Sequence, residues 1–109
     1  MREFKTSTIW LDGETTFTGV PLMALLDHVG ATGGNLEAIA LNDYKITIPV
    51  ETIEEDAPIV AYLIDGEAMS PRGKGPLWIV YPYDKDAKYR TEVIYSRSIW
   101  QLDRISLVE

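Results

Sequence analysis

The clearest alternation of apolar and polar residues runs over positions 44–50. Its apolar side consists of Tyr44, Ile46, Ile48 and Val50, and the residues between them are Lys45, Thr47 and Pro49. A period of two with one apolar face is typical of a half-buried β-strand. The chain also predicts a strand over Glu37 to Leu41, and the intervening Asn42-Asp43 favours a tight hairpin turn.

Two nearly continuous apolar runs follow, Pro58 to Ile64 and Leu77 to Tyr81. Strands that are buried on both faces have this pattern, so we expect both runs near the centre of a sheet. Shorter strand patterns lie over Lys5 to Leu11 and over Leu102 to Val108. The polar stretch Tyr83 to Arg90 is expected to be a loop.

One segment has a clear helical period. Its apolar residues are Leu22, Leu25, Leu26 and Val29, which share one helical face. Pro21 suits the first turn and Gly30 suits the C-terminal cap, so we predict the main helix over residues 21–30. The stretch Thr91 to Gln101 fits a helix or extended chain, and the acidic run Glu51 to Asp56 is compatible with one helical turn.

These elements amount to one main helix, short helical turns and six or seven strands, with mixed connections that indicate the α+β class. The length of 109 residues suits a single domain over 1–109. A net charge of −7 argues against sequence-independent nucleic-acid binding, which requires a basic face. The chain has no cysteine and a lone histidine, so we expect no metal site.

The segment from Gly66 to Pro82 carries the strongest sign of a binding function. It is a Gly- and Pro-rich loop that holds Arg72 and Lys74 and leads into the second apolar run. Such a loop on a rigid strand can present donors to a small ligand, and Arg97 offers a second donor cluster. The alternative stays open that the aromatic residues belong to the core and the arginines serve solubility. No catalytic constellation is recognisable, because the one histidine has no evident nucleophile beside it.

Several short motifs occur in a fixed order along the chain. They are Gly19-Val20-Pro21-Leu22 with Leu25-Leu26 and Gly30-Ala31, then Ala40 to Tyr44, Pro58 to Glu67, Lys74-Gly75-Pro76-Leu77, and Arg97 to Trp100 with Arg104-Ile105. Taken in order, they resemble the sulfite oxidase-like, molybdopterin-binding fold over most of the chain from Phe17 onward. The resemblance implies a mixed sheet or barrel with one main helix.

This chain departs from that family's enzymes, which bind molybdenum through a cysteine. It is more similar to the small exported relatives that bind a pterin and act as sensors without catalysis. The resemblance therefore implies a pterin ligand, a reduced pterin or a molybdopterin-like compound, and a periplasmic location after removal of an export signal. It also implies a membrane-bound signalling partner, often an enzyme of cyclic di-GMP metabolism, with no nucleic acid and no direct membrane insertion.

The resemblance also suggests which residues hold the pterin. They are Asn42, Arg72, Lys74, Trp78, Tyr95, Ser96, Arg97 and Trp100. The cations would donate to the pterin carbonyl and ring nitrogens, Asn42 or else Asp43 would meet the amino-pyrimidinone edge, and the aromatic residues would stack or form walls. Two other functions remain open: a subunit of a molybdopterin-dependent oxidoreductase that takes its metal ligand elsewhere, and a protein-interaction module without a ligand.

Overall fold

The structure, a computed structural model, describes residues 2–30, 33–55, 57–70 and 72–108. Its strands are β1 (Arg2–Ser7), β2 (Glu14–Pro21), β3 (Asn35–Ala40), β4 (Lys45–Pro49), β5 (Ile59–Ile64), β6 (Glu67–Ala68), β7 (Trp78–Val80) and β8 (Leu102–Val108). Its helices are α1 (Leu22–Val29) and α2 (Glu92–Arg97), with 3-10 turns η1 (Val50–Thr52) and η2 (Ala87–Tyr89). This mixture of antiparallel strands and few helices is α+β.

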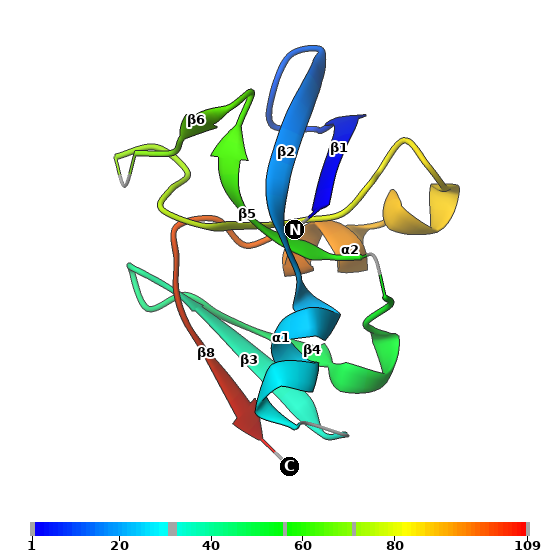
Figure 1. Cartoon of the computed structure of the whole chain (residues 1–109), viewed down its shortest axis with the longest axis vertical. Helices are drawn as coiled ribbons and strands as arrows, with labels where there is room; N and C mark the ends of the chain where they lie inside the picture. Colours follow the sequence, from blue (N-terminus) through cyan, green and yellow to red (C-terminus); the bar gives the residue numbers. More distant parts are fainter. Residues whose placement is uncertain (1, 31–32, 56, 71, 109) are drawn as a thin grey trace.

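A five-stranded sheet forms the upper half of the molecule in Figure 1, in the order β1-β2-β5-β6 with β7 also paired to β5. β5 is its central strand. It pairs with β2 along one side and with both β6 and β7 along the other side. The first apolar run forms the central strand β5, as predicted, whereas the second forms β7, which among the described residues pairs with β5 alone and lies at the edge of the sheet. The turn Asp65-Gly66 joins β5 to β6 with positive φ angles of 49° and 83°, the geometry of a type I′ hairpin.

The lower half in Figure 1 is a three-stranded antiparallel sheet in the order β4-β3-β8. The predicted hairpin is confirmed, and its turn includes Asp43 at φ 67°. The terminal strand is confirmed over Leu102–Val108. Tyr44, however, precedes the strand and is 55% exposed, so it does not belong to the apolar face that the alternation predicted.

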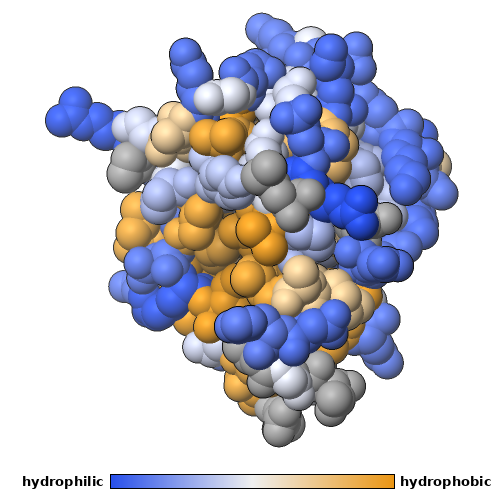
Figure 2. Space-filling model, in the orientation of Figure 1, coloured by the Kyte–Doolittle hydropathy of each residue, from blue (hydrophilic) through white to orange (hydrophobic). Residues whose placement is uncertain are grey.

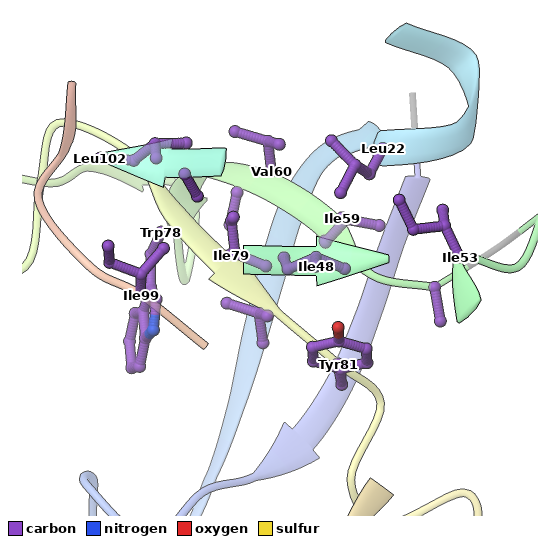
Figure 3. Close-up of a cluster of buried hydrophobic side chains, with 14 of the residues drawn as sticks. Leu22, Ile48, Ile53, Ile59, Val60, Trp78, Ile79, Tyr81, Ile99 and Leu102 are labelled. Atoms are coloured by element: carbon purple, nitrogen blue, oxygen red, sulfur yellow. The ribbon is translucent and has the colours of Figure 1, made fainter. Parts of the chain in front are cut away.

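The core lies between the two sheets. Figure 3 shows side chains from β4, β5, β7 and the start of β8 converging there, including Ile48, Ile59, Ile79 and Leu102. β7 also bridges the sheets, since the Ile79 N–H donates to the Ile99 carbonyl at 2.9 Å and the Leu102 N–H donates to the Leu77 carbonyl at 2.9 Å. Each such fully buried side chain contributes roughly 1.5–3 kcal/mol through removal of apolar surface from water.

The predicted main helix is confirmed as α1. Pro21 precedes it, and Gly30 ends it in the left-handed conformation at φ 74°. Leu22 and Leu26 are buried in the core, whereas Leu25 of the predicted apolar face is 39% exposed. Residues 31–32, which follow this helix, lie outside the described residues, as does Asp56 at the end of the acidic run.

The ambiguous stretch from Thr91 onward contains α2. The Thr91 hydroxyl accepts a hydrogen bond from the Ile94 N–H at 3.2 Å, which is the bond of a helix N-cap. The polar loop before it holds η2, capped in the same way by Asp86. A local capping bond therefore favours the helix over the extended alternative.

The sequence-based prediction was wrong near the N-terminus. The strand expected over Lys5 to Leu11 ends at Ser7, and the following β2 was missed. The two-residue strand β6 was also not predicted, so the described residues form eight strands instead of six or seven. After Ser7 the chain turns, because the Thr8 hydroxyl accepts hydrogen bonds from the Trp10 N–H at 3.2 Å and the Leu11 N–H at 3.0 Å. The turn carries Trp10 out of the strand and toward the core.

Asp84 joins the end of β1 to the segment after β7. Its carboxylate accepts from the Ser7 N–H at 2.7 Å and from the Ser7 hydroxyl, and its own N–H donates to the Thr6 hydroxyl at 3.0 Å. The pKa of the Asp84 carboxyl is lowered from its ordinary value of 3.8. The main cause is the hydrogen bond from the Ser7 hydroxyl, and the second is the bond from the Ser7 N–H.

A pH-dependent loss of stability follows from this carboxylate. Because the pKa is lower in the folded protein, the stabilisation is complete above about 3.8 and is lost as the pH falls through the lower, folded-state value. Thermal unfolding followed by circular dichroism at decreasing pH measures it. Asp84→Asn should flatten this acid dependence, while Asp12→Asn, an exposed aspartate in the β1–β2 loop, should leave it unchanged. Equal profiles for wild type and Asp84→Asn would contradict the assignment.

Candidate functional site

A cleft of about 310 Å³ opens beside the tip of the β3–β4 hairpin, at the low end of the range for small-molecule sites. It is bounded by the hairpin turn, α2, the segment before β8 and the turn after β1. The lining residues are Trp10, Ala40, Asn42, Tyr44, Tyr95, Ser96, Ser98, Ile99, Trp100 and Gln101. None of these described residues is charged.

Aromatic rings form the walls of the cleft. Trp10 lies at their centre, with ring centroids 5.6 Å from Trp100 and 5.8 Å from Tyr95, both edge-to-face. Its ring also lies 5.7 Å from Trp78 and 6.1 Å from Tyr83, which are buried behind the wall. Edge-to-face packing of this kind holds each ring in a fixed orientation. The walls of the cleft are therefore aromatic surfaces whose orientations are set by packing within the protein.

Besides the hydroxyl groups of Tyr44, Tyr95 and Ser98, the cleft has polar groups from Asn42, Ser96 and Gln101. The Asn42 side-chain oxygen accepts from the Tyr44 N–H at 3.1 Å, and its NH₂ group has no partner among the described residues. The Ser96 hydroxyl donates to the Val93 carbonyl at 2.7 Å, which leaves its oxygen able to accept. The Gln101 NH₂ group donates to the Gly73 carbonyl at 2.7 Å and so attaches the Gly/Pro-rich loop to the rim of the cleft.

Ser98 connects the cleft to the buried aromatic residues behind it. Its hydroxyl accepts from the Tyr83 hydroxyl at 2.5 Å and donates to the Ile94 carbonyl at 2.9 Å. Its carbonyl accepts from the Trp78 indole N–H at 3.2 Å. Burial raises the pKa of Tyr83, so the phenol stays protonated and keeps donating. This network fixes α2 against the core.

Replacing Ser98 with alanine is expected to lower the free energy of unfolding by about 1–3 kcal/mol, because the buried Tyr83 hydroxyl loses its partner. Urea unfolding followed by tryptophan fluorescence measures the loss. Ser96→Ala is the matched control, since Ser96 is exposed and bonds only within its own helix. Equal stabilities for the two variants would show that the Tyr83–Ser98 bond contributes nothing.

The structure brings four of the sequence-predicted ligand residues together at the cleft, Asn42, Tyr95, Ser96 and Trp100. Trp78 is fully buried, in contact with Phe17 and Trp100, and does not line the cleft. Its position therefore favours the core role that the sequence left open.

The three predicted cations lie outside the cleft lining. Lys74 places its ammonium group 4.0 Å from the Trp100 ring centroid. Arg97 donates to the Thr52 hydroxyl at 3.3 Å and lies against Tyr81, whose pKa burial raises to about 12. Arg72 is exposed in the loop, with its backbone N–H bonded to the Ser70 hydroxyl. A ligand in this cleft would therefore meet neutral groups first.

Asp43, the alternative acceptor for an amino group, has a side chain that is 84% exposed and forms an ion pair with Arg104 at 3.4 Å. The lining residues that sequence reasoning missed are Trp10, Ala40, Tyr44, Ser98, Ile99 and Gln101. Trp10 and Tyr44 each stand beside a turn signal, which could have marked them as lying off their strands. Gln101 has a positive φ of 53°, which no local sequence signal indicates.

No protein-family model matches this chain, and no curated protein matches it. The description of the site therefore rests on its own geometry. Among the described residues, no group of three or more His, Asp or Glu side chains could hold a metal ion. No helix within the described ranges has the length and apolar character needed to cross a membrane.

Proposed function

We propose that this protein is a non-enzymatic binding domain for a pterin, and that the ligand occupies the aromatic cleft. The observation that carries the proposal is the combination of aromatic walls with neutral donors and acceptors and no charged lining residue. A pterin is a flat ring system whose edge alternates hydrogen-bond donors and acceptors. Sites for such ligands are mostly apolar, with a few fixed polar groups that set the orientation.

The roles of Asn42 and Ser96 follow from the hydrogen bonds that they make in the ligand-free protein. The unpartnered NH₂ group of Asn42 donates to the pterin carbonyl or a ring nitrogen, while Ser96 accepts from the ligand amino group. Tyr95 and Trp100 provide the faces and edges against which the ring packs. Arg72, Lys74 and Arg97, which were predicted to contact the ligand, then make no direct contact with it, because they do not line the cleft.

The wider biological setting is a proposal that rests on the ordered motifs. The likeness to the sulfite oxidase-like fold supports a periplasmic sensor that signals to a membrane-bound partner, for example an enzyme that makes or degrades cyclic di-GMP. The α+β architecture agrees with that proposal at the level of fold class. Fusing the natural upstream region to a reporter that is active only after export tests the compartment.

Binding is tested by isothermal titration calorimetry with tetrahydrobiopterin and biopterin. We expect Asn42→Asp to weaken binding about ten-fold, because the aspartate removes the NH₂ donor while keeping an oxygen for the Tyr44 N–H. Asn35→Asp, an exposed asparagine at the start of β3, is the matched control. Absence of binding by any pterin to folded wild-type protein would exclude the proposal, and equal affinities of the two variants would exclude the cleft as the site.

One observation favours the interaction module as a second candidate. Leu41 and Tyr44 at the hairpin tip are 47% and 55% exposed, beside the mouth of the cleft. Figure 2 also shows apolar surface between the two halves of the molecule on the face in view. Exposed apolar surface of this kind is typical of protein contact sites. If Leu41→Ser abolishes partner binding while pterins do not bind, this second function holds.

A further inference from the structure

We propose that Lys74 determines the electronic preference of the cleft by acting through Trp100. The inference rests on the proposed function, since it concerns the same ligand, but it assigns Lys74 a different role from that of a direct donor. The structure places the Lys74 ammonium against the wall of the cleft, 4.0 Å from the Trp100 ring centroid and 5.5 Å from that of Trp78. Both distances are within the range of cation–π attraction.

Within the described part of the chain, the charge of Lys74 has no competing partner. No carboxylate of the described residues forms an ion pair with it, and its side chain is partly buried. Its backbone is held in place, because the Gln101 N–H donates to the Lys74 carbonyl at 2.8 Å and the Gln101 side chain donates to the Gly73 carbonyl. Turn bonds run from the Gly73 and Gly75 N–H groups to the Ser70 carbonyl, at 3.0 and 2.9 Å. These bonds hold the backbone from which the Lys74 side chain reaches Trp100.

Trp100 lines the cleft but Lys74 does not. The ammonium lies over the Trp100 ring without lining the cleft, and in the proposed arrangement the ligand packs against the opposite face or the edge of the indole. A cation on one side of an aromatic ring draws π-electron density toward itself. The side offered to the ligand becomes less negative, which strengthens packing against an electron-rich ring and weakens packing against an electron-poor ring.

This reasoning predicts a ratio of affinities. Tetrahydrobiopterin has an electron-rich pyrimidinone ring fused to a saturated, puckered ring, and biopterin is the flat, electron-poor form with the same side chain. Lys74→Met keeps the length and apolar stem of the side chain and removes the charge. We expect the preference for tetrahydrobiopterin over biopterin to fall by roughly three- to ten-fold in Lys74→Met, in line with the strength of a partly buried cation–π contact. Lys74→Arg should restore most of the preference, because it keeps the charge.

Lys88→Met is the matched control. In the wild type, the Lys88 ammonium lies 5.1 Å from the centroid of the Tyr89 ring, and Tyr89 does not line the cleft. Calorimetry with both ligands, under reducing conditions, gives the ratio for each variant, and the emission maximum of the ligand-free protein reports whether Lys74 contacts Trp100 in solution. A shifted emission in Lys74→Met with an unchanged affinity ratio would overturn the inference while leaving pterin binding intact. If neither pterin binds to wild type, the proposed function fails and this inference fails with it.

Discussion

Replacing Gly19 with alanine is expected to lower the free energy of unfolding by about 3 kcal/mol or more. A Cβ atom at this position would lie 2.6 Å from the Val60 carbonyl carbon and 2.7 Å from the Ala61 Cα, and it would also meet the Val60 carbonyl oxygen. All three atoms belong to the backbone of β5, so no side chain can move aside. The register of β2 against β5 shifts between Thr18 and Gly19, and this irregularity brings the two backbones together.

Urea unfolding of Gly19→Ala measures this effect. Gly33→Ala is the matched control, because a Cβ there would have no heavy atom within 4 Å. We expect the control to stay within about 0.5 kcal/mol of wild type. A Gly19→Ala protein as stable as the control would mean that β2 and β5 do not approach as closely as described. Gly19 is the first residue of the motif Gly19-Val20-Pro21-Leu22. The close approach of β5 gives this glycine a packing role.

Replacing Trp78 with alanine is expected to cost about 3–5 kcal/mol, a large part of the roughly 5–15 kcal/mol that stabilises a typical domain. The indole is fully buried, its N–H donates to the Ser98 carbonyl, and its ring packs 5.3 Å from Phe17 and 6.2 Å from Trp100. Its loss would leave a cavity behind the wall of the cleft. Replacing a tryptophan that stacks on a ligand and has one face open to solvent would lower the free energy of unfolding much less.

Urea unfolding distinguishes these roles, and Trp78→Phe provides a milder variant that retains a ring if the alanine protein does not fold. Val93→Ala on α2, whose side chain is 57% exposed, is the control and should change stability by no more than about 0.5 kcal/mol. We expect Trp78→Phe to fall between them, since it loses the indole hydrogen bond but fills most of the volume. If Trp78→Ala were as stable as the control, Trp78 would not be a core residue, and the predicted role in ligand binding would be favoured again.

Local signals predicted α1 well. Pro21 at its start and Gly30 at its end are short-range features, and both hold in the structure, whereas Leu25 of the predicted apolar face is exposed. The Asn42-Asp43 turn was recognisable for the same reason, because few residues tolerate a positive φ such as that of Asp43. By contrast, β2 was missed because its threonines and Gly19 give no continuous apolar run, and only its pairing with β1 and β5 defines it.

The candidate site was only partly predictable. Asn42, Tyr95, Ser96 and Trp100 were expected and do line the cleft, whereas Trp10 comes from the other end of the chain. No periodicity relates Trp10 to Trp100, since their contact depends on how the turn after β1 is placed against the segment before β8. Arg97 shows the same limit, because the orientation of α2 directs its guanidinium to Thr52 and away from the cleft.

By itself, the sequence determined the α+β class, the main helix, the hairpin turns and the two apolar strands, because period and φ preference act over a few neighbouring residues. The tertiary structure alone decided that Trp78 is core, that the cleft is lined by neutral groups, and that Lys74 lies against Trp100. These outcomes depend on strand register and helix orientation, which set contacts between residues far apart in the chain.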